Sequence, residues 1–223
     1  MCGVFGVSLS TVGADDIELI RRTFLQTMIR GKHATGLSYV KGGVLTTIKR
    51  GEPVTQFLKQ LDFSDFINED GGLYMIGHIR YSTSDIHFNQ PFSNDSISIA
   101  HNGVLSQDEP ENWKYKCETA NDSEMILKSY EAGKNPLQDF MQESMAVVTI
   151  TSDKKLSCYR NHERPLWYTE LDNGIIFTST KDIAIRSGLN KPLKCEMFTE
   201  YNYDGKTLET IQVDFNTDIE DLQ

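Results

Sequence analysis

The chain has 223 residues, of which 39% are apolar, and this is enough for one well-packed core. A formal net charge of −10 and a pI near 5.0 argue against nucleic acid or an anionic membrane as the main partner. No stretch approaches the roughly 18 consecutive apolar residues that cross a bilayer, and residues 1–10 lack the positive segment of a secretion signal. We therefore expect a single domain over residues 1–223 that acts in the cytoplasm.

The four cysteines are widely and irregularly spaced, at Cys2, Cys117, Cys158 and Cys195. The chain has no Cys-x-x-Cys pair followed by a histidine pair, which argues against a zinc site and against a disulfide framework. We expect the last three to be small, half-buried apolar residues in a reducing compartment. The sequence predicts no metal and no cofactor.

The periodicity of apolar residues predicts strands and helices along the whole chain. The strands are expected at residues 4–10, 37–40, 44–49, 74–79, 96–102, 145–152, 156–160, 166–170 and 174–179. The helices are expected at residues 15–28, 55–66, 123–130, 136–141 and 182–187. Asp15 or Asp16 is the expected N-cap of the first helix, and Gly42 with Gly43 is the expected turn of the first hairpin.

Most of the predicted strands follow one another in hairpins, and the helices gather between blocks of strands. This order indicates an α+β fold with mostly antiparallel sheets. Residues from about 191 to 223 are expected to form terminal strands and a solvated acidic tail.

Cys2 becomes the N-terminal residue once Met1 is removed, and a small second residue permits that removal. Its α-amino group, with an ordinary pKa near 8, then lies beside its own sulfur and can take the thiol proton, directly or through one water. Because the thiolate is the nucleophile, this pairing favours an activated cysteine. Many proteins begin Met-Cys without catalytic reason, but Gly3 and Gly6 leave room for a substrate beside this one.

Arg80 lies at the end of a predicted buried strand, in the motif GHIRYSTS at residues 77–84, which NQPF follows at 89–92. A guanidinium group in this position suits a carboxylate ligand held in a bidentate fork. Further contacts to such a carboxylate are expected from the hydroxyls of Ser82, Thr83 and Ser84. An ordinary surface loop is the alternative interpretation.

Three shorter motifs complete the set. Taken alone, RGKHATG at residues 30–36 is typical of a helix C-terminus followed by a glycine turn. In HNG at residues 101–103, a side-chain amide and a flexible backbone N–H stand side by side, as an oxyanion hole requires, although a plain Asn-Gly turn is the commoner local reading. Asp122 opens a predicted helix, where it is either an N-cap or a carboxylate for the α-ammonium group of an amino acid.

Taken in their order along the chain, these five elements resemble the glutaminase domain of class II glutamine amidotransferases. This N-terminal-nucleophile family includes glutamine phosphoribosylpyrophosphate amidotransferase and glucosamine-6-phosphate synthase. The resemblance runs from Cys2 to about Gly188, and residues 77–83 and 89–92 are similar to the phosphoribosylpyrophosphate branch, as are Arg160 and residues 164–166. It implies the four-layer αββα sandwich of N-terminal-nucleophile hydrolases.

The resemblance also implies roles. Cys2 corresponds to the nucleophile, with its α-amine as general base and acid, and Asn102 and Gly103 correspond to the oxyanion hole. Arg80 and Asp122 correspond to the residues that hold the glutamine carboxylate and ammonium groups. The other expected substrate-binding residues are Tyr81, Ser82 and Thr83. Arg30 corresponds to an arginine that positions the nucleophile, and His78 and His101 are expected to be hydrogen-bonded scaffold residues, not metal ligands.

We therefore expect hydrolysis of L-glutamine to L-glutamate and ammonia through a γ-glutamyl thioester on Cys2. Large family members continue into a synthase domain, whereas this chain stops at Gln223. A separate synthase protein that docks over the site and receives the ammonia is therefore the expected partner. Two alternatives stay open: another N-terminal-nucleophile amide hydrolase, and a non-catalytic glutamine-binding regulatory subunit that keeps Met1.

Overall fold

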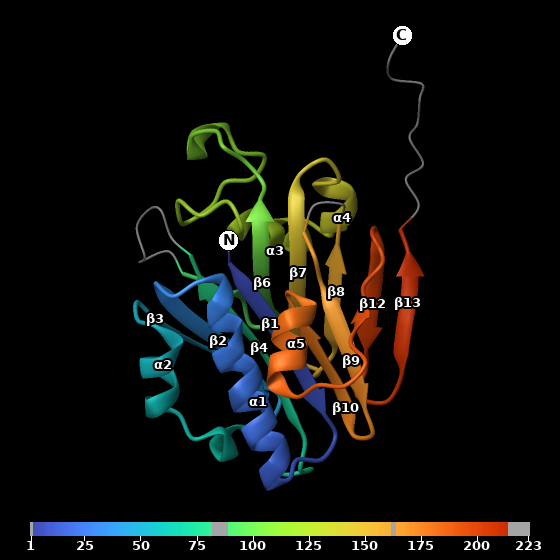
Figure 1. Ribbon diagram of the computed structural model, residues 1–223. Coiled ribbons are helices and arrows are strands. Elements are labelled where there is room, and N and C mark those ends of the chain that lie inside the picture. The colour runs from blue at the N-terminus through green and yellow to red at the C-terminus, as the bar shows by residue number, and fades with distance from the viewer. Residues whose placement is uncertain (1, 82–88, 162–163, 214–223) are drawn as a thin grey trace.

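The computed structural model describes residues 2–81, 89–161 and 164–213, and its strands form two antiparallel sheets stacked face to face (Figure 1). The strands of the first sheet are β1 (Gly3–Leu9), β2 (Ala34–Lys41), β3 (Val44–Arg50), β4 (Leu73–Arg80), β9 (Trp167–Leu171), β10 (Gly174–Thr178) and β11 (Leu193–Lys194). Those of the second are β5 (Phe92–Ser93), β6 (Ile97–Val104), β7 (Ser144–Thr151), β8 (Leu156–Arg160), β12 (Thr199–Tyr203) and β13 (Leu208–Gln212). The spatial orders are β11-β9-β10-β1-β4-β2-β3 and β13-β12-β8-β7-β6-β5.

Helices cover the outer faces of both sheets. They are α1 (Ala14–Gln26), α2 (Val54–Phe57), α3 (Glu124–Glu131), α4 (Pro136–Asp139) and α5 (Lys181–Ser187). Short 3₁₀ turns lie at η1 (Thr27–Arg30), η2 (Leu58–Gln60), η3 (Phe63–Phe66) and η4 (Pro110–Asn112). None of the helices within the described ranges is long and apolar enough to span a bilayer.

Strand alternation sorts the apolar side chains into three layers. On β1, Phe5 and Val7 pack toward α1 and α2, whereas Val4 packs between the two sheets. On the second sheet, Val148 of β7 joins the layer between the sheets and Val147 packs toward α3 and α4. Three apolar layers between four layers of secondary structure confirm the expected α+β, αββα sandwich.

Most element positions agree with the sequence predictions to within one or two residues. β8 covers residues 156–160 as predicted, and the hairpin of β2 and β3 turns at Gly42 and Gly43. Their φ angles of 58° and 79° lie in the left-handed region that glycine adopts without steric cost.

Two predictions about helices are wrong. The single helix expected at residues 55–66 is replaced by α2, η2 and η3, because the backbone is extended at Leu61 and Asp62. The Asp62 carboxylate accepts a hydrogen bond from Ser64 N at 2.9 Å and so starts a new turn. The N-cap of α1 is Gly13, not Asp15 or Asp16; the Asp16 carboxylate accepts from Gly13 N at 2.8 Å from within the first turn.

The N-terminal part of β1 is held on every side. β1 pairs with β10 on one edge and with β4 on the other. The Phe5 ring contacts the Phe24 ring of α1, with centroids 4.5 Å apart. Val4 N donates to Ser179 Oγ at 2.6 Å, and the same hydroxyl donates to Val4 O at 3.0 Å. The residue that precedes β1 is therefore carried by a strand that is paired on both edges, in the centre of the first sheet (Figure 1).

Candidate active site

Cys2 lies at the edge of the gap between the sheets, directly before β1. In the β1–β4 pair Gly3 is opposite Ile79, so one further step of the same register brings Cys2 opposite Arg80. Val4 and Ile76 belong to the layer between the sheets, and by the two-residue period Cys2 and Arg80 point toward the same side. The sequence thus delivers both residues, 78 positions apart, to one place.

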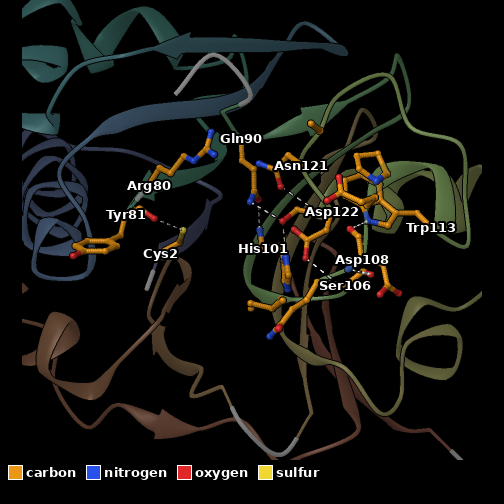
Figure 2. Close-up of a pocket in the computed structure, with 17 residues that line it drawn as sticks. Cys2, Arg80, Tyr81, Gln90, His101, Ser106, Asp108, Trp113, Asn121 and Asp122 are labelled. Atoms are coloured by element: carbon orange, nitrogen blue, oxygen red, sulfur yellow. Dashed lines mark hydrogen bonds between the residues drawn. The ribbon is translucent and has the colours of Figure 1, made fainter. Parts of the chain in front are cut away.

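A cavity of about 510 Å³ opens at this place. Figure 2 shows Cys2, Arg80 and Tyr81 on one side of it, and Gln90, His101, Asp122 and Trp113 on the other. The remaining lining residues are Gly103, Val104, Ser106, Gln107, Asp108, Glu109, Pro110, Ala120, Asn121 and Ser123. A volume in the range of small-molecule sites, with a few converging polar groups, makes this the candidate active site.

The Cys2 thiol lies in an environment that disfavours its ionisation. Its Sγ contacts Tyr81 O at 4.0 Å. Burial raises the pKa of the Cys2 thiol above its ordinary value; the Arg80 cation opposes this rise and the Asp122 carboxylate adds to it. Arg80 and Asp122 line the same cavity as Cys2. Because the thiol pKa is raised, the nucleophile needs a base.

Arg30 and Gly3 fix the backbone next to the sulfur. Arg30 Nε donates to Cys2 O at 3.4 Å. A Cβ atom on Gly3 would lie 2.5 Å from Thr27 Cγ2 and 2.9 Å from Thr27 O, so only glycine lets η1 approach the start of β1 this closely. Burial lowers the pKa of the Arg30 guanidinium group, and nearby Arg164 lowers it further.

Asn102 and Gly103 lie on β6, and of the two only Gly103 is among the residues that line the cavity. Asn102 is 2% exposed, and its Nδ2 is a buried donor without a hydrogen-bond acceptor among the described residues. Such a donor has a hydrogen bond still to make. Gly103 lines the cavity, and a Cβ there would lie 1.8 Å from Ser144 O and 2.5 Å from His101 Nε2. The backbone at 103 can therefore approach its neighbours only because the residue is glycine.

Asp122 does not cap a helix with its side chain. The N-cap of α3 is Ser123, and Asp122 Oδ2 accepts from Leu105 N at 2.6 Å and from Ser106 N at 3.2 Å. Both bonds tie the carboxylate to the chain that leaves β6. Both bonds are accepted by Oδ2. Asp122 also lines the cavity, which is where a carboxylate that binds an ammonium group is expected.

The remaining predicted residues are Tyr81, Ser82, Thr83, His78 and His101. The Tyr81 side chain is 51% exposed and stacks on His33 with ring centroids 5.2 Å apart, so its carbonyl, not its ring, meets Cys2. Ser82 and Thr83, with Ser84, lie outside the described residues. His101 is hydrogen-bonded as expected. His78 is fully buried, and its polar contacts are with the Asn89 side chain and the His101 backbone.

Sequence reasoning assigned no role to Gln90, Ser123 or Trp113, which line the same cavity. Gln90 belongs to the NQPF motif at residues 89–92, and Ser123 directly follows Asp122, but the sequence does not show which atoms these two side chains contact.

Within residues 2–81, 89–161 and 164–213, no group of three or more histidine, cysteine, aspartate or glutamate side chains is arranged to hold a metal ion.

The two stacked antiparallel sheets, with a cysteine at the head of a central strand, are the fold of N-terminal-nucleophile hydrolases. No protein-family profile matches the chain, and no curated protein matches it. Solved structures are similar to the chain. A glutamine phosphoribosylpyrophosphate amidotransferase from B. subtilis, complexed with ADP and GMP, superposes with a TM-score of 0.74 at 20% identity over 96% of this chain and 50% of that one.

Two other solved structures are similar. An allosteric regulatory enzyme of purine biosynthesis has a TM-score of 0.71 at 21% identity, again over 96% of this chain and 50% of that one. A glutamine aminotransferase class-II domain protein from Silicibacter pomeroyi has a TM-score of 0.55 at 8% identity, over 95% of this chain and 99% of that one. The chain thus spans about half the length of the first two and has the fold of class II glutamine amidotransferases, as the resemblance implied.

Proposed function

We propose that residues 1–223 form one glutaminase domain, which hydrolyses L-glutamine to L-glutamate and ammonia with Cys2 as the nucleophile. One observation carries the proposal: Cys2, Arg80 and Asp122 line a single cavity. A cation on one side of the cavity and a carboxylate on the other match the α-carboxylate and α-ammonium groups of a free amino acid. A thiol and an unpaired amide donor are what its side-chain amide needs.

The amino-acid end of glutamine is held by charge. Arg80, buried at the end of β4, takes the α-carboxylate in a bidentate fork. Asp122, fixed by Leu105 N and Ser106 N, takes the α-ammonium group. Fixing both groups directs the γ-amide carbon toward Cys2 and turns the attack into an intramolecular step. Tyr81 O contacts Sγ and helps to orient it.

The chemistry then uses the N-terminus. Because burial raises the thiol pKa, the α-amine of Cys2, freed by removal of Met1, accepts the thiol proton as Sγ attacks the amide carbon. Asn102 Nδ2 and Gly103 N donate to the oxyanion. The α-ammonium group returns its proton to the departing ammonia and leaves a γ-glutamyl thioester. The amine next takes a proton from water, whose oxygen attacks the thioester. Glutamate is released, and the α-ammonium group returns the proton to the departing Cys2 thiolate, which restores the thiol and the free amine.

We further propose that the ammonia passes to a separate synthase protein. Ammonium, the form that prevails in neutral water, has no lone pair and cannot attack an acceptor, so release close to the acceptor favours transfer. Tyr81 and Val104 at the mouth of the cavity are 51% and 38% exposed and offer apolar surface to a partner. All four cysteines are free, which supports a reducing cytoplasmic setting. Amide-¹⁵N glutamine tests the transfer: ¹⁵N in the synthase product supports it, and ¹⁵N found only in the medium contradicts it.

Substitution of the nucleophile tests the core of the proposal. Cys2→Ser should abolish glutamate release while the unfolding temperature stays that of the wild type, and Cys117→Ser should change neither. Full activity in Cys2→Ser would contradict the assignment. Hydrolysis of N-acyl amides in preference to glutamine would favour another amide hydrolase, and an inactive protein that retains Met1 in intact-mass measurement would favour a regulatory subunit.

A further inference from the structure

A closed set of hydrogen bonds lies in the cavity wall opposite Cys2 (Figure 2). Gln90 Oε1 accepts from His101 N at 2.7 Å, and Gln90 Nε2 donates to Ser123 Oγ at 3.0 Å. Ser123 Oγ lies 2.8 Å from His101 Nδ1. His101 Nε2 lies 3.3 Å from Ser144 O. The three linked side chains are nearly inaccessible to water, so their bonds are not exchanged for bonds to solvent.

For a neutral His101 ring, the donors and acceptors leave one consistent proton arrangement. Ser144 O is a carbonyl oxygen and can only accept, so Nε2 of His101 carries a proton. Gln90 Nε2 can only donate, so the Ser123 oxygen accepts from it and gives its own proton to the unprotonated Nδ1 of His101. The neutral ring is therefore protonated at Nε2. Burial lowers the pKa of His101 and favours this neutral form, although Asp122 and the Ser144 carbonyl act in the opposite direction.

Two members of the set are next in sequence to groups of the proposed mechanism. His101 directly precedes Asn102 and Gly103, and its ring lies against Gly103, where a Cβ would be 2.5 Å from Nε2. Ser123 directly follows Asp122. Gln90 lies two residues before β5. The hydrogen bonds thus join three segments that are separate in the sequence.

We propose that Gln90, Ser123 and His101 are positioning residues that hold the oxyanion donors of β6 in register with the ammonium-binding carboxylate of Asp122. This proposal rests on the proposed glutaminase function. The physical reason is that a donor stabilises a developing oxyanion only if it is already in place when the charge appears. None of the three side chains has to touch the reacting atoms.

Removal of one hydroxyl is the first test. Ser123→Ala deletes the link between Gln90 and His101 and adds no bulk. It should lower kcat for glutamine by about 10- to 100-fold, less than the 10²- to 10³-fold typical of losing an oxyanion donor itself, with KM changed less than threefold. Ser8→Ala is the matched control, because Ser8 is also a buried serine, its hydroxyl has no hydrogen-bond partner among the described residues, and it lies at the far end of β1. It should leave kcat and KM unchanged. Wild-type kcat in Ser123→Ala would overturn the proposal.

A reversal of the hydrogen bonds is the second test and needs no turnover. In Gln90→Glu, the carboxylate can only accept, so the Ser123 proton turns toward it and His101 Nδ1 must donate to Ser123 Oγ. Imidazole ¹⁵N shifts at pH 7 should show a neutral, Nε2-protonated His101 in the wild type and a doubly protonated ring in Gln90→Glu. Asp122 supports this charge and Arg164 opposes it.

The two tests separate this proposal from the glutaminase assignment. If the wild type fails to hydrolyse glutamine while the histidine signals behave as stated, the activity assignment fails and the hydrogen-bond network stands. If glutamine is hydrolysed but His101 is Nδ1-protonated in the wild type, or kcat is unaffected by Ser123→Ala, the network has no positioning role. Far-ultraviolet circular dichroism and an unfolding temperature for each variant exclude loss of fold as the cause. Gln90→Met supplies an uncharged substitution at position 90.

Discussion

Substitution of Asn102 should change activity and stability in different directions. Its Nδ2 is buried without an acceptor in the described part of the chain, a state that costs the resting fold about 1–3 kcal/mol. The same atom is proposed to donate to the oxyanion, a contribution of about 2.7–4 kcal/mol in comparable enzymes. Asn102→Ala should therefore lower kcat by about 10²- to 10³-fold, while the free energy of unfolding stays unchanged or rises by up to ~2 kcal/mol.

Asn68 offers the matched control, because its amide is also buried but forms hydrogen bonds through both its nitrogen and its oxygen. Asn68 Nδ2 donates to Val40 O at 2.9 Å, and Asn68 Oδ1 accepts from Gly42 N at 2.9 Å. Asn68→Ala should lose about 1–3 kcal/mol of stability and keep its kcat. Glutamate release under saturating glutamine and urea unfolding measure the two quantities. A loss of more than about 1 kcal/mol in Asn102→Ala would mean that its amide is paired in the resting enzyme, and an unchanged kcat would refute the oxyanion assignment.

Three further outcomes follow from the site. Arg80→Lys should raise KM for glutamine at least tenfold and change kcat much less, since one ammonium cannot reproduce a bidentate fork; an unchanged KM would remove Arg80 from the clamp. Gly103→Ala should unfold at lower urea concentration and lose activity, because the new methyl group would lie 1.8 Å from Ser144 O; wild-type stability would show that β6 can shift. Burial lowers the pKa of His78 to about 3, whereas it titrates near 6.5 in the unfolded chain. The free energy of unfolding should therefore be flat in this contribution above pH 6.5 and fall below it, by about 2 kcal/mol at pH 5. His78→Gln should reduce that loss, and an identical acid profile would contradict it.

The sequence was sufficient for the layers and for the identity of the candidate nucleophile. Alternation of apolar residues located the strands because burial on a sheet face has a period of two, and β8 was placed to the residue. The helix expected at 55–66 failed because Asp62 makes a local hydrogen bond with Ser64 that competes with helix continuation.

The candidate site was predictable only where a residue type implies its chemistry. Cys2, Arg80 and Asp122 carry such information, and the structure brings all three to one cavity. Gln90 does not, since an amide serves equally well on a surface, and its contacts with β6 and Ser123 exist only after the two sheets have stacked. The unpaired state of Asn102 Nδ2 is likewise a property of the packed structure.

The central claim is that a free Cys2 carries the glutamyl group during turnover. Acid quenching within the first turnovers on ¹³C-labelled glutamine, followed by mass spectrometry of the N-terminal peptide, tests it most directly. We predict a peptide that begins at Cys2 and bears a labelled glutamyl group on that residue, with no label on Cys117. Turnover by a protein that retains Met1, or label carried at any residue other than Cys2, would contradict the account.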